Sequence, residues 1–290
     1  MTRVLVCGDV INDVVAAPLA APVPDDDTPA VISLSPGGSA ANQAAWLGYL
    51  GVDVVFAGRA GADDAEFHRR ELARFGVSPR ITADPGAQTG QIVVLVEPGG
   101  ERTMITDRGA NARLSPSDVP LELLDGLDLL LLSGYLFASP GPREVALSLI
   151  AAARSRGTAF AIDPGSAAAL EGFPRWTRGA AVCFPNRDEG FALTGSTSPE
   201  AMAARLADWY ELVVLKLGAE GALVAGATGV ERVAANRVAG AIDSTGAGDA
   251  FTAAFLVDWL TGADPVEAAR RAVAVAARAL VIRGGRPPSR

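Results

Sequence analysis

The feature that most constrains the fold is a run of small residues between two acids, followed at once by an apolar segment. Asp243-Ser244-Thr245-Gly246-Ala247-Gly248-Asp249 leads into an apolar run over residues 250–260. Glycines allow a tight turn and a close approach of the backbone to a ligand. A helix that begins here leaves its first N–H groups without acceptors inside the helix, at the positive end of its dipole. The run therefore predicts an anion-binding turn at the start of a buried helix.

Asp249 stands at the mouth of this turn, where a carboxylate repels an anion unless it handles a proton. An anion-binding turn beside a base suits phosphoryl transfer, because that reaction needs positioning, stabilisation of charge and deprotonation of the nucleophile. The alternative is an ordinary helix start with Asp243 as a capping or turn residue. The complete nine-residue pattern, residues 243–251, favours phosphoryl transfer.

The composition argues against several other classes of protein. The 290 residues carry 25 Lys and Arg against 33 Asp and Glu, a formal net charge of -8, and show no basic cluster. We therefore expect no nucleic-acid partner. The apolar stretches are too short and interrupted to span a bilayer, and the start lacks a signal-peptide layout. A cytoplasmic protein is expected.

Scarce residue types narrow the chemistry further. His68 is the one histidine and lies in a charged, helix-like segment, so it is expected to be solvated. Cys7 and Cys183 are expected to be buried free thiols. These counts argue against a zinc site and a Ser-His-Asp triad. Lys216 is the only lysine and does not follow a glycine, so the chain contains no Walker A loop.

Short apolar runs alternate with helix-like segments, which predicts a parallel sheet covered by helices on both faces. Residues 14–34 interrupt the pattern with four prolines and an acidic run, which indicate an irregular, solvated excursion. Residues 88–96 and 102–105 predict a hairpin; Arg102 and Arg108 are interpreted as solvated strand-end charges, with substrate contact as the alternative. Other strands are expected at residues 3–7, 54–56, 129–132, 160–162, 181–184 and 211–217, and helices at residues 63–75, 142–156, 187–193, 199–209, 250–260 and 265–282.

Two N-terminal turns carry side chains suited to a hydroxyl-bearing ligand. Gly8 ends the first expected strand and Asp13 follows; its carboxylate can accept from two adjacent hydroxyls, although Asp13 alone is also typical of a surface turn. Gly37 and Gly38 precede an apolar helix pattern. Asn42, about one turn into that helix, offers donors and an acceptor.

Two turns in the C-terminal half also follow expected strands. Asn186 and Glu189 have the spacing of a capping box, in which each side chain satisfies a backbone N–H at the helix start. Lys216 precedes a Gly-x-x-Gly turn at Gly218 and Gly221. Its ammonium suits contact with phosphate, and the alternative is an extended side chain at a strand end.

Along the chain, the motifs lie at residues 8–13, 37–42, 186–189, 216–221 and 243–251. In this order they resemble the motifs of the ribokinase family, the phosphofructokinase-B group of carbohydrate kinases. The resemblance covers essentially the whole chain. It implies a single ribokinase-like three-layer α/β/α domain over residues 1–290, with a mostly parallel central sheet and a small β-sheet lid from about residues 14–34 and 88–111. Ser39 departs from the pattern, since some relatives carry a basic residue there, and this argues against a phosphorylated sugar as substrate.

The resemblance implies an ATP-dependent kinase that transfers the γ-phosphate to a primary hydroxyl of a sugar or sugar-like substrate, with Mg²⁺ and a role for K⁺. Asp249 would be the general base, and the Gly-Ala-Gly N–H groups would stabilise charge on the phosphoryl group. Asn186 and Glu189 would organise magnesium and its waters. The implied site residues are Asp249, Gly246, Ala247 and Gly248 for catalysis; Asp13, Gly37, Gly38 and Asn42 for the substrate; Asn186, Lys216, Gly218 and Gly221 for the nucleotide; Glu189 for magnesium through water; and Asp243, Thr245 and Gly285 for a monovalent cation.

The residues leave other functions open. A nucleoside kinase of the same family differs only in its acceptor pocket, shaped by the lid and by Ser133, Gly134 and Tyr135. A non-catalytic sugar or nucleotide sensor is a second alternative, and an enzyme that uses Lys216 as a pyridoxal-phosphate Schiff base is a third. An exposed lid edge would allow two subunits to pair as a homodimer.

Overall fold

The structure is a computed structural model that describes residues 2–96, 102–167, 170, 172–236, 238 and 243–288. The strands of its large sheet are β1 (Arg3–Cys7), β4 (Asp53–Gly61), β5 (Val77–Asp84), β8 (Leu129–Ser133), β9 (Ala159–Asp163), β10 (Val182–Cys183), β11 (Val213–Lys216), β12 (Ala222–Gly226) and β13 (Gly229–Val233). Their order is β13-β12-β11-β10-β9-β8-β1-β4-β5. The strands from β11 to β5 run parallel, and β12 pairs antiparallel with both of its neighbours, β11 and β13.

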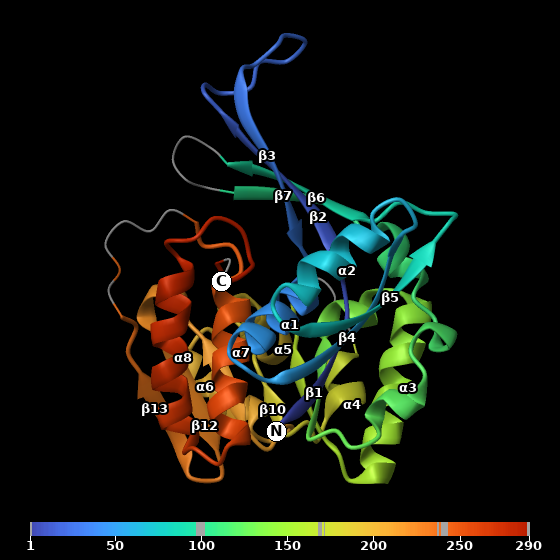
Figure 1. Ribbon diagram of the computed structural model, residues 1–290. Helices are drawn as coiled ribbons and strands as arrows, with labels where there is room; N and C mark the ends of the chain where they lie inside the picture. Colours follow the sequence, from blue (N-terminus) through green and yellow to red (C-terminus); the bar gives the residue numbers. More distant parts are fainter. Residues whose placement is uncertain are drawn as a thin grey trace.

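Helices cover both faces of this sheet (Figure 1). The helices are α1 (Ser39–Tyr49), α2 (Ala65–Ala73), α3 (Pro140–Arg156), α4 (Phe173–Thr177), α5 (Arg187–Thr194), α6 (Pro199–Leu206), α7 (Ala247–Leu260) and α8 (Pro265–Ala279). Successive side chains of a strand point to opposite faces. Val4 and Val6 of β1 therefore pack with α1, α2, α7 and α8, whereas Leu5 and Cys7 pack with α3, α4 and α6. No helix in the described part of the chain is long and apolar enough to cross a membrane.

A second, smaller sheet stands away from this α/β body (Figure 1). Its strands are β2 (Ile11–Pro18), β3 (Ala30–Gly37), β6 (Gly90–Val96) and β7 (Arg102–Asp107), in the order β3-β2-β6-β7. Strand β2 follows closely after β1, and β3 leads directly into α1. The small sheet therefore joins the body at the carboxyl end of β1, where parallel α/β folds bind their ligands.

The segment of residues 14–34 is more regular than its prolines indicated. Strand β2 runs to Pro18 and β3 begins at Ala30, so the prediction of an irregular excursion was wrong at both ends. The two strands pair antiparallel along their full length, and Pro18 is the last residue of its strand, where a missing N–H costs little. The predicted hairpin is confirmed as β6 and β7, and its turn, residues 97–101, lies outside the described residues.

Three strands lie where the alternation predicted none. Strand β5 forms one edge of the large sheet, and β12 with β13 forms a hairpin at the other edge. An edge strand packs on fewer neighbours, so its hydrophobic pattern is weaker. In β13, four of the five residues are exposed, and only Val233 is buried. The remaining strand and helix predictions match elements of the structure, with bounds that differ by a few residues.

Candidate active site

Helix α7 begins at the predicted anion-binding turn. Gly246 is its N-cap, and its φ of 72° lies in the left-handed region that favours glycine. The first N–H groups of a helix find no acceptor within it. The backbone nitrogen of Ala247 lies 3.3 Å from the Ser244 carbonyl oxygen. This hydrogen bond is long, so a stronger acceptor can replace it. Asp249 occupies the third position of the helix.

Helix α1 holds the Asp249 carboxylate. Ser39 Oγ donates to Oδ1 at 2.7 Å, Asn42 Nδ2 donates to Oδ2 at 3.0 Å, and Gln43 Nε2 lies 3.3 Å from Oδ1. Burial raises the pKa of Asp249 to about 7; the bonds from Ser39 and Asn42 oppose this rise, and the Asp163 charge adds to it. A carboxyl with a pKa near neutrality suits proton transfer at physiological pH.

The C-terminal loop packs against the predicted anion-binding turn. Both carboxylate oxygens of Asp243 accept backbone N–H groups, from Thr245 at 2.8 Å and from Gly284 at 2.9 Å. The backbones also touch, because a Cβ on Gly246 would overlap Gly285 Cα. The structure thus brings the three residues predicted for a monovalent cation into one contact region.

Asp13 lies on β2 against the glycines that precede α1. A Cβ on Gly37 would overlap the Asp13 carboxylate, and Gly38 has a φ of 93° with no room for a Cβ beside the Asp9 backbone. Burial and the nearby Asp9 charge raise the pKa of Asp13 to about 6, while Arg286 opposes the rise. Asp13 is 7% exposed, which argues against the alternative of a surface turn acid.

Arg286 connects the predicted substrate residues to the C-terminal loop. Its Nε donates to Asn42 Oδ1 at 3.1 Å, and one terminal nitrogen donates to the Gly37 carbonyl oxygen at 3.5 Å. Burial lowers the pKa of Arg286 to about 10, and the Asp13 and Asp249 charges partly offset this effect. Asn42 therefore lies between Asp249 and Arg286, with each end of its amide fixed by a charged group.

Asn186 and Glu189 form the predicted capping box at the start of α5. Glu189 N donates to Asn186 Oδ1 at 2.9 Å, and Asn186 N and Nδ2 donate to the two Glu189 carboxylate oxygens at 2.8 Å each. Burial raises the pKa of Glu189 to about 7, and the Lys216 ammonium opposes the rise. A backbone bridge between Asn186 and Lys216 sets the two motifs side by side.

The Lys216 side chain points into the site. Its Nζ donates to Asp163 Oδ2 at 2.7 Å and lies 3.8 Å from where a Cβ on Gly248 would stand. The side chain is 15% exposed, so its ammonium lies inside the protein and not at a solvated strand end. Gly218 and Gly221 follow in the predicted turn with φ of 60° and 94°.

Comparison with known proteins identifies the family of the chain. The sequence model of the pfkB family of carbohydrate kinases matches residues 1–289. The chain belongs to this family of carbohydrate kinases. The ATP-dependent ribose-1-phosphate kinase of Halopiger xanaduensis is 31% identical over 278 residues, which cover 91% of this chain and 87% of that protein.

Two solved structures show the same fold. Adenosine kinase from Sinorhizobium meliloti superposes with a TM-score of 0.89 at 25% identity, over 99% of this chain and 97% of that one. A putative ribokinase II from E. coli, in complex with ATP and Mg²⁺, superposes with a TM-score of 0.86 at 22% identity, over 100% of this chain and 96% of that one. The predicted family, fold class and enzyme class, a phosphotransferase, are confirmed, and the pyridoxal-phosphate alternative loses its support.

Two buried residues of this pfkB kinase site were missed by sequence reasoning. Gln43 Nε2 donates to Asp163 Oδ2 at 3.0 Å and also contacts Asp249. A signal for Asp163 was present, because it directly follows the predicted strand of residues 160–162, at the sheet edge where ligands bind. Gln43 carries no comparable signal, because its spacing alone is that of a helix core position.

The expectation of a solvated His68 was wrong. His68 is fully buried, its Nε2 lies 2.9 Å from Asn12 Oδ1, and burial lowers its pKa to about 4. Ala65, His68 and Leu72 are the buried residues of α2 and have helical spacing, which the charged neighbours obscured. Cys7 and Cys183 are buried free thiols, as predicted.

Arg108 differs from the solvated strand-end charge that was expected. Its guanidinium carbon lies 4.6 Å from the centre of the Tyr135 ring, in a cation–π geometry. Arg108 therefore contacts the region predicted to shape the acceptor pocket. The side chain of Arg102 lies outside the described residues.

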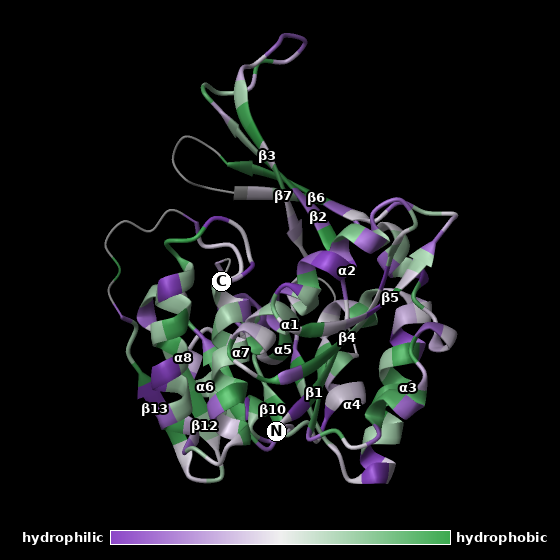
Figure 2. Cartoon of the chain, in the orientation of Figure 1, coloured by the Kyte–Doolittle hydropathy of each residue, from purple (hydrophilic) through white to green (hydrophobic). Residues whose placement is uncertain are grey.

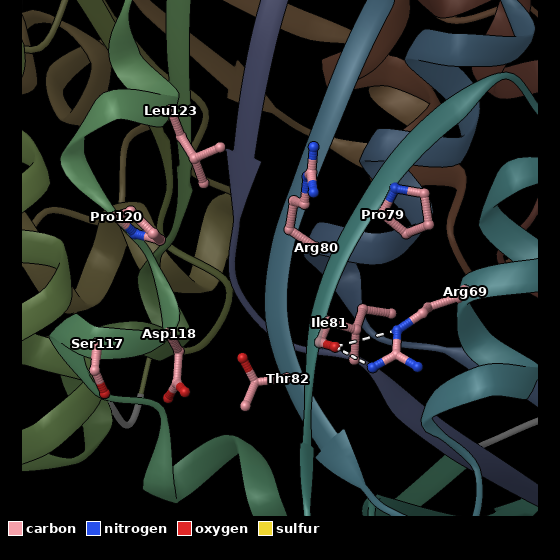
Figure 3. Close-up of a pocket in the computed structure, with 9 residues that line it drawn as sticks. All are labelled: Arg69, Pro79, Arg80, Ile81, Thr82, Ser117, Asp118, Pro120 and Leu123. Atoms are coloured by element: carbon pink, nitrogen blue, oxygen red, sulfur yellow. Dashed lines mark hydrogen bonds between the residues drawn. The ribbon is translucent and has the colours of Figure 1, made fainter.

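A surface pocket of about 390 Å³ lies away from these residues (Figure 3). It opens beside edge strand β5, with Arg80 and Thr82 on the strand and Asp118 opposite. Arg69 donates from Nε and a terminal nitrogen to the Ile81 carbonyl oxygen, which an edge strand leaves unpaired. None of the residues that line the pocket belongs to the Asp249 site.

Proposed function

We propose that this kinase transfers the γ-phosphate of ATP to a primary hydroxyl of a sugar or sugar-like acceptor. The observation that carries the proposal is Asp249, a half-buried carboxyl that Ser39 and Asn42 hold in the first turn of a helix with a glycine N-cap, and whose pKa is raised to about 7. The likeness to the ribose-1-phosphate kinase of Halopiger xanaduensis supports a sugar acceptor, and the ATP and Mg²⁺ bound in the E. coli structure support the donor.

In the proposed reaction, Asp249 accepts the proton of the acceptor hydroxyl as its oxygen attacks the γ-phosphorus. The bond from that phosphorus to the β-γ bridging oxygen breaks, and ADP leaves. The first-turn N–H groups of Gly246, Ala247 and Gly248 stabilise the charge on the transferring phosphoryl group. Ser39 and Asn42 fix the carboxylate, so little reorganisation is needed when the proton moves.

The acceptor is proposed to lie between Asp249 and Asp13, and the absence of a Cβ on Gly37 lets the Asp13 carboxylate lie against the backbone at this place. The Asp13 carboxylate would accept from two adjacent hydroxyls. Asn42 would contribute when the acceptor competes for its amide, which now bridges Asp249 and Arg286. Movement of the small sheet over the acceptor would exclude water, which otherwise consumes ATP.

The residues around Glu189 and Lys216 fit a magnesium–nucleotide complex whose metal ion they contact through water. Both Glu189 oxygens are engaged in the capping box, and the residue is 2% exposed, so direct ligation is disfavoured and a contact through water is the fit that remains. Magnesium bound with ATP neutralises phosphate charge. Lys216 would contact a phosphate, and the Gly218 and Gly221 turn would lie against the nucleotide.

The donor chemistry near Asp243 also fits a monovalent cation. Asp243 supplies carboxylate oxygens, which accept backbone N–H groups of Thr245 and Gly284, and Thr245 and Gly285 supply oxygens within the same contact region. We propose K⁺ as an activator at this place, since hard oxygen donors suit such a cation.

The acceptor class is decided by an ADP-release assay with Mg-ATP. The panel compares free sugars, sugar acids, sugar phosphates and nucleosides, each with and without K⁺. A nucleoside acceptor is the second candidate, favoured by the likeness to adenosine kinase. Ser39, which is neutral and bonded to Asp249, argues against a phosphorylated sugar, whereas the Halopiger relative's name favours one. If no acceptor class in the panel supports ADP release, the proposal is contradicted.

We expect kcat/KM to fall as the pH drops below about 7, because Asp249 must be ionised to accept a proton and burial raises its pKa to about 7. Ser39→Ala removes a hydrogen bond that favours the carboxylate, so the acid limb should move to higher pH. A pH series of kcat/KM for both proteins measures this. An acid limb at the same pH in Ser39→Ala would contradict the assignment of the limb to Asp249.

We propose that the small sheet pairs two subunits. Val31, Ile32 and Leu34 of β3 and Met104 of β7 expose 59–77% of their surface, and Figure 2 shows green, hydrophobic stretches in this sheet beside purple ones. A dimer is expected in sedimentation velocity, and Ile32→Asp should dissociate it. Phe191→Asp, an exposed apolar residue of α5, is the matched control. A monomeric wild type at every concentration would refute the pairing.

A further inference from the structure

Asp163 is the point at which three separate parts of the site meet. It ends β9, is 3% exposed, and its Oδ2 accepts three hydrogen bonds. Gln43 Nε2 of α1 donates at 3.0 Å, Lys216 Nζ of β11 at 2.7 Å and Thr252 Oγ1 of α7 at 3.0 Å. One carboxylate oxygen thus joins three residues that lie 53 to 120 positions from Asp163 in the sequence.

Gln43 extends this contact to the proposed base. Its Nε2 donates to Asp163 and lies 3.3 Å from Asp249 Oδ1, so one NH₂ group lies between two carboxylates. Gln43 is fully buried, and its Oε1 has no hydrogen-bond partner among the described residues. The reversed amide would set Oε1 against both carboxylates, so the two acids together fix its orientation.

The Lys216 ammonium depends on the same carboxylate. Burial alone lowers the pKa of Lys216, but the Asp163 and Glu189 charges raise it above its usual range, so the side chain stays cationic. The ammonium lies 3.8 Å from the Cβ position of Gly248, which places its charge at the first turn of α7. A buried cation without a partner would be costly, so Asp163 is needed to hold it there.

We propose that Asp163 is a positioning residue for phosphoryl transfer, which holds the Lys216 ammonium at the anion-binding turn and, through Gln43, sets the position of Asp249. The inference rests on the proposed function. Asp163 would then position two groups that act in the reaction. The Lys216 ammonium acts on the phosphate, and Asp249 acts on the acceptor hydroxyl.

Charge substitutions at this contact should have opposite effects on Asp249. The charged groups that act on Asp249 are Asp163 from β9, Lys216 from β11 and Arg286 from the C-terminal loop, and the Glu189 carboxylate of α5 acts on both Asp163 and Lys216. Asp163 raises the pKa of Asp249 and Lys216 lowers it. Removal of the Asp163 charge should therefore move the acid limb of the kcat/KM profile to lower pH. Removal of the Lys216 charge should move it to higher pH.

The test measures kcat/KM against pH for Asp163→Asn, Lys216→Met and the control Thr252→Val, which removes a neutral donor to the same oxygen. Asp163→Asn should lower kcat/KM about 10- to 100-fold, the usual effect of losing a hydrogen bond to a charged group, and shift the acid limb down. Lys216→Met should shift it up. Thr252→Val should leave the limb in place, with kcat/KM within a few-fold.

Asp163→Glu keeps the charge and should restore the wild-type limb, which tests the proposal even if Asp163→Asn is unstable. Equal behaviour of Asp163→Asn and Thr252→Val, or a limb that Asp163→Asn leaves in place, would overturn the positioning role. A wild type that transfers no phosphate to any acceptor would instead refute the proposed function, and with it this inference. Circular dichroism and thermal melts identify variants that do not fold.

Discussion

Asp249→Asn should lower kcat by roughly 10²- to 10⁴-fold, the usual contribution of a general base. Asparagine has nearly the same shape and can still accept a hydrogen bond from Ser39, but it cannot take up the proton of the acceptor hydroxyl. Steady-state ADP release with the best acceptor measures the loss. A kcat within a few-fold of the wild type would remove Asp249 from its proposed role.

The stability of the same variant separates catalysis from folding. Burial raises the pKa of Asp249 to about 7, which means that the folded protein holds its charged form at a cost. Neutral asparagine removes that cost at pH 8, so the melting temperature of Asp249→Asn should not fall. Asp264→Asn is the matched control, because Asp264 is the N-cap of α8 and asparagine caps equally well. It should change neither activity nor melting temperature.

Gly246→Ala should destabilise the protein and abolish most of its activity. The φ of Gly246 is 72°, a conformation that costs other residues about 1–3 kcal/mol. The added Cβ would also overlap Gly285 Cα and lie 2.7 Å from the Gly285 carbonyl oxygen, and overpacking of this kind costs about 1–3 kcal/mol more. The C-terminal loop or the turn must move. A shift of about 1 Å in the anion-binding N–H groups can lower the rate about 100-fold.

Gly262→Ala separates the two costs. Gly262 follows α7 with a φ of 89°, but a Cβ there meets no heavy atom within 4 Å. It therefore carries only the cost of the backbone conformation, and its activity should match the wild type. Denaturant unfolding and kcat/KM measure both variants. If Gly246→Ala keeps wild-type activity, the turn does not position the N–H groups as proposed.

The predictions that succeeded rest on local patterns. The start of α7 at Gly246 and Ala247 and the capping box of Asn186 and Glu189 each depend on residues within one turn of the chain, where spacing alone carries the geometry. The parallel sheet followed from repeated alternation of strands and helices, and a resemblance over the whole chain gave the family.

What the sequence could not supply are contacts between distant segments. Asp163 and Gln43 lie 120 residues apart, and only the packing of α1 over the end of β9 brings them together. His68 was placed in solvent because its neighbours are charged, whereas its own position on α2 faces the body. Arg286 carried no prediction of its own, and its bond to Asn42 depends on how the C-terminal loop returns to α1.

The measurement that tests the central claim most directly is phosphorus NMR of the reaction product, with the acceptor chosen by the ADP-release panel. Phosphate esterified to a CH₂–OH group couples to two protons and gives a triplet, and phosphate on a ring hydroxyl couples to one and gives a doublet. The account predicts a triplet that forms at the rate of ADP release and is lost in Asp249→Asn. A doublet, inorganic phosphate alone, or a triplet that persists at the wild-type rate in Asp249→Asn would contradict it.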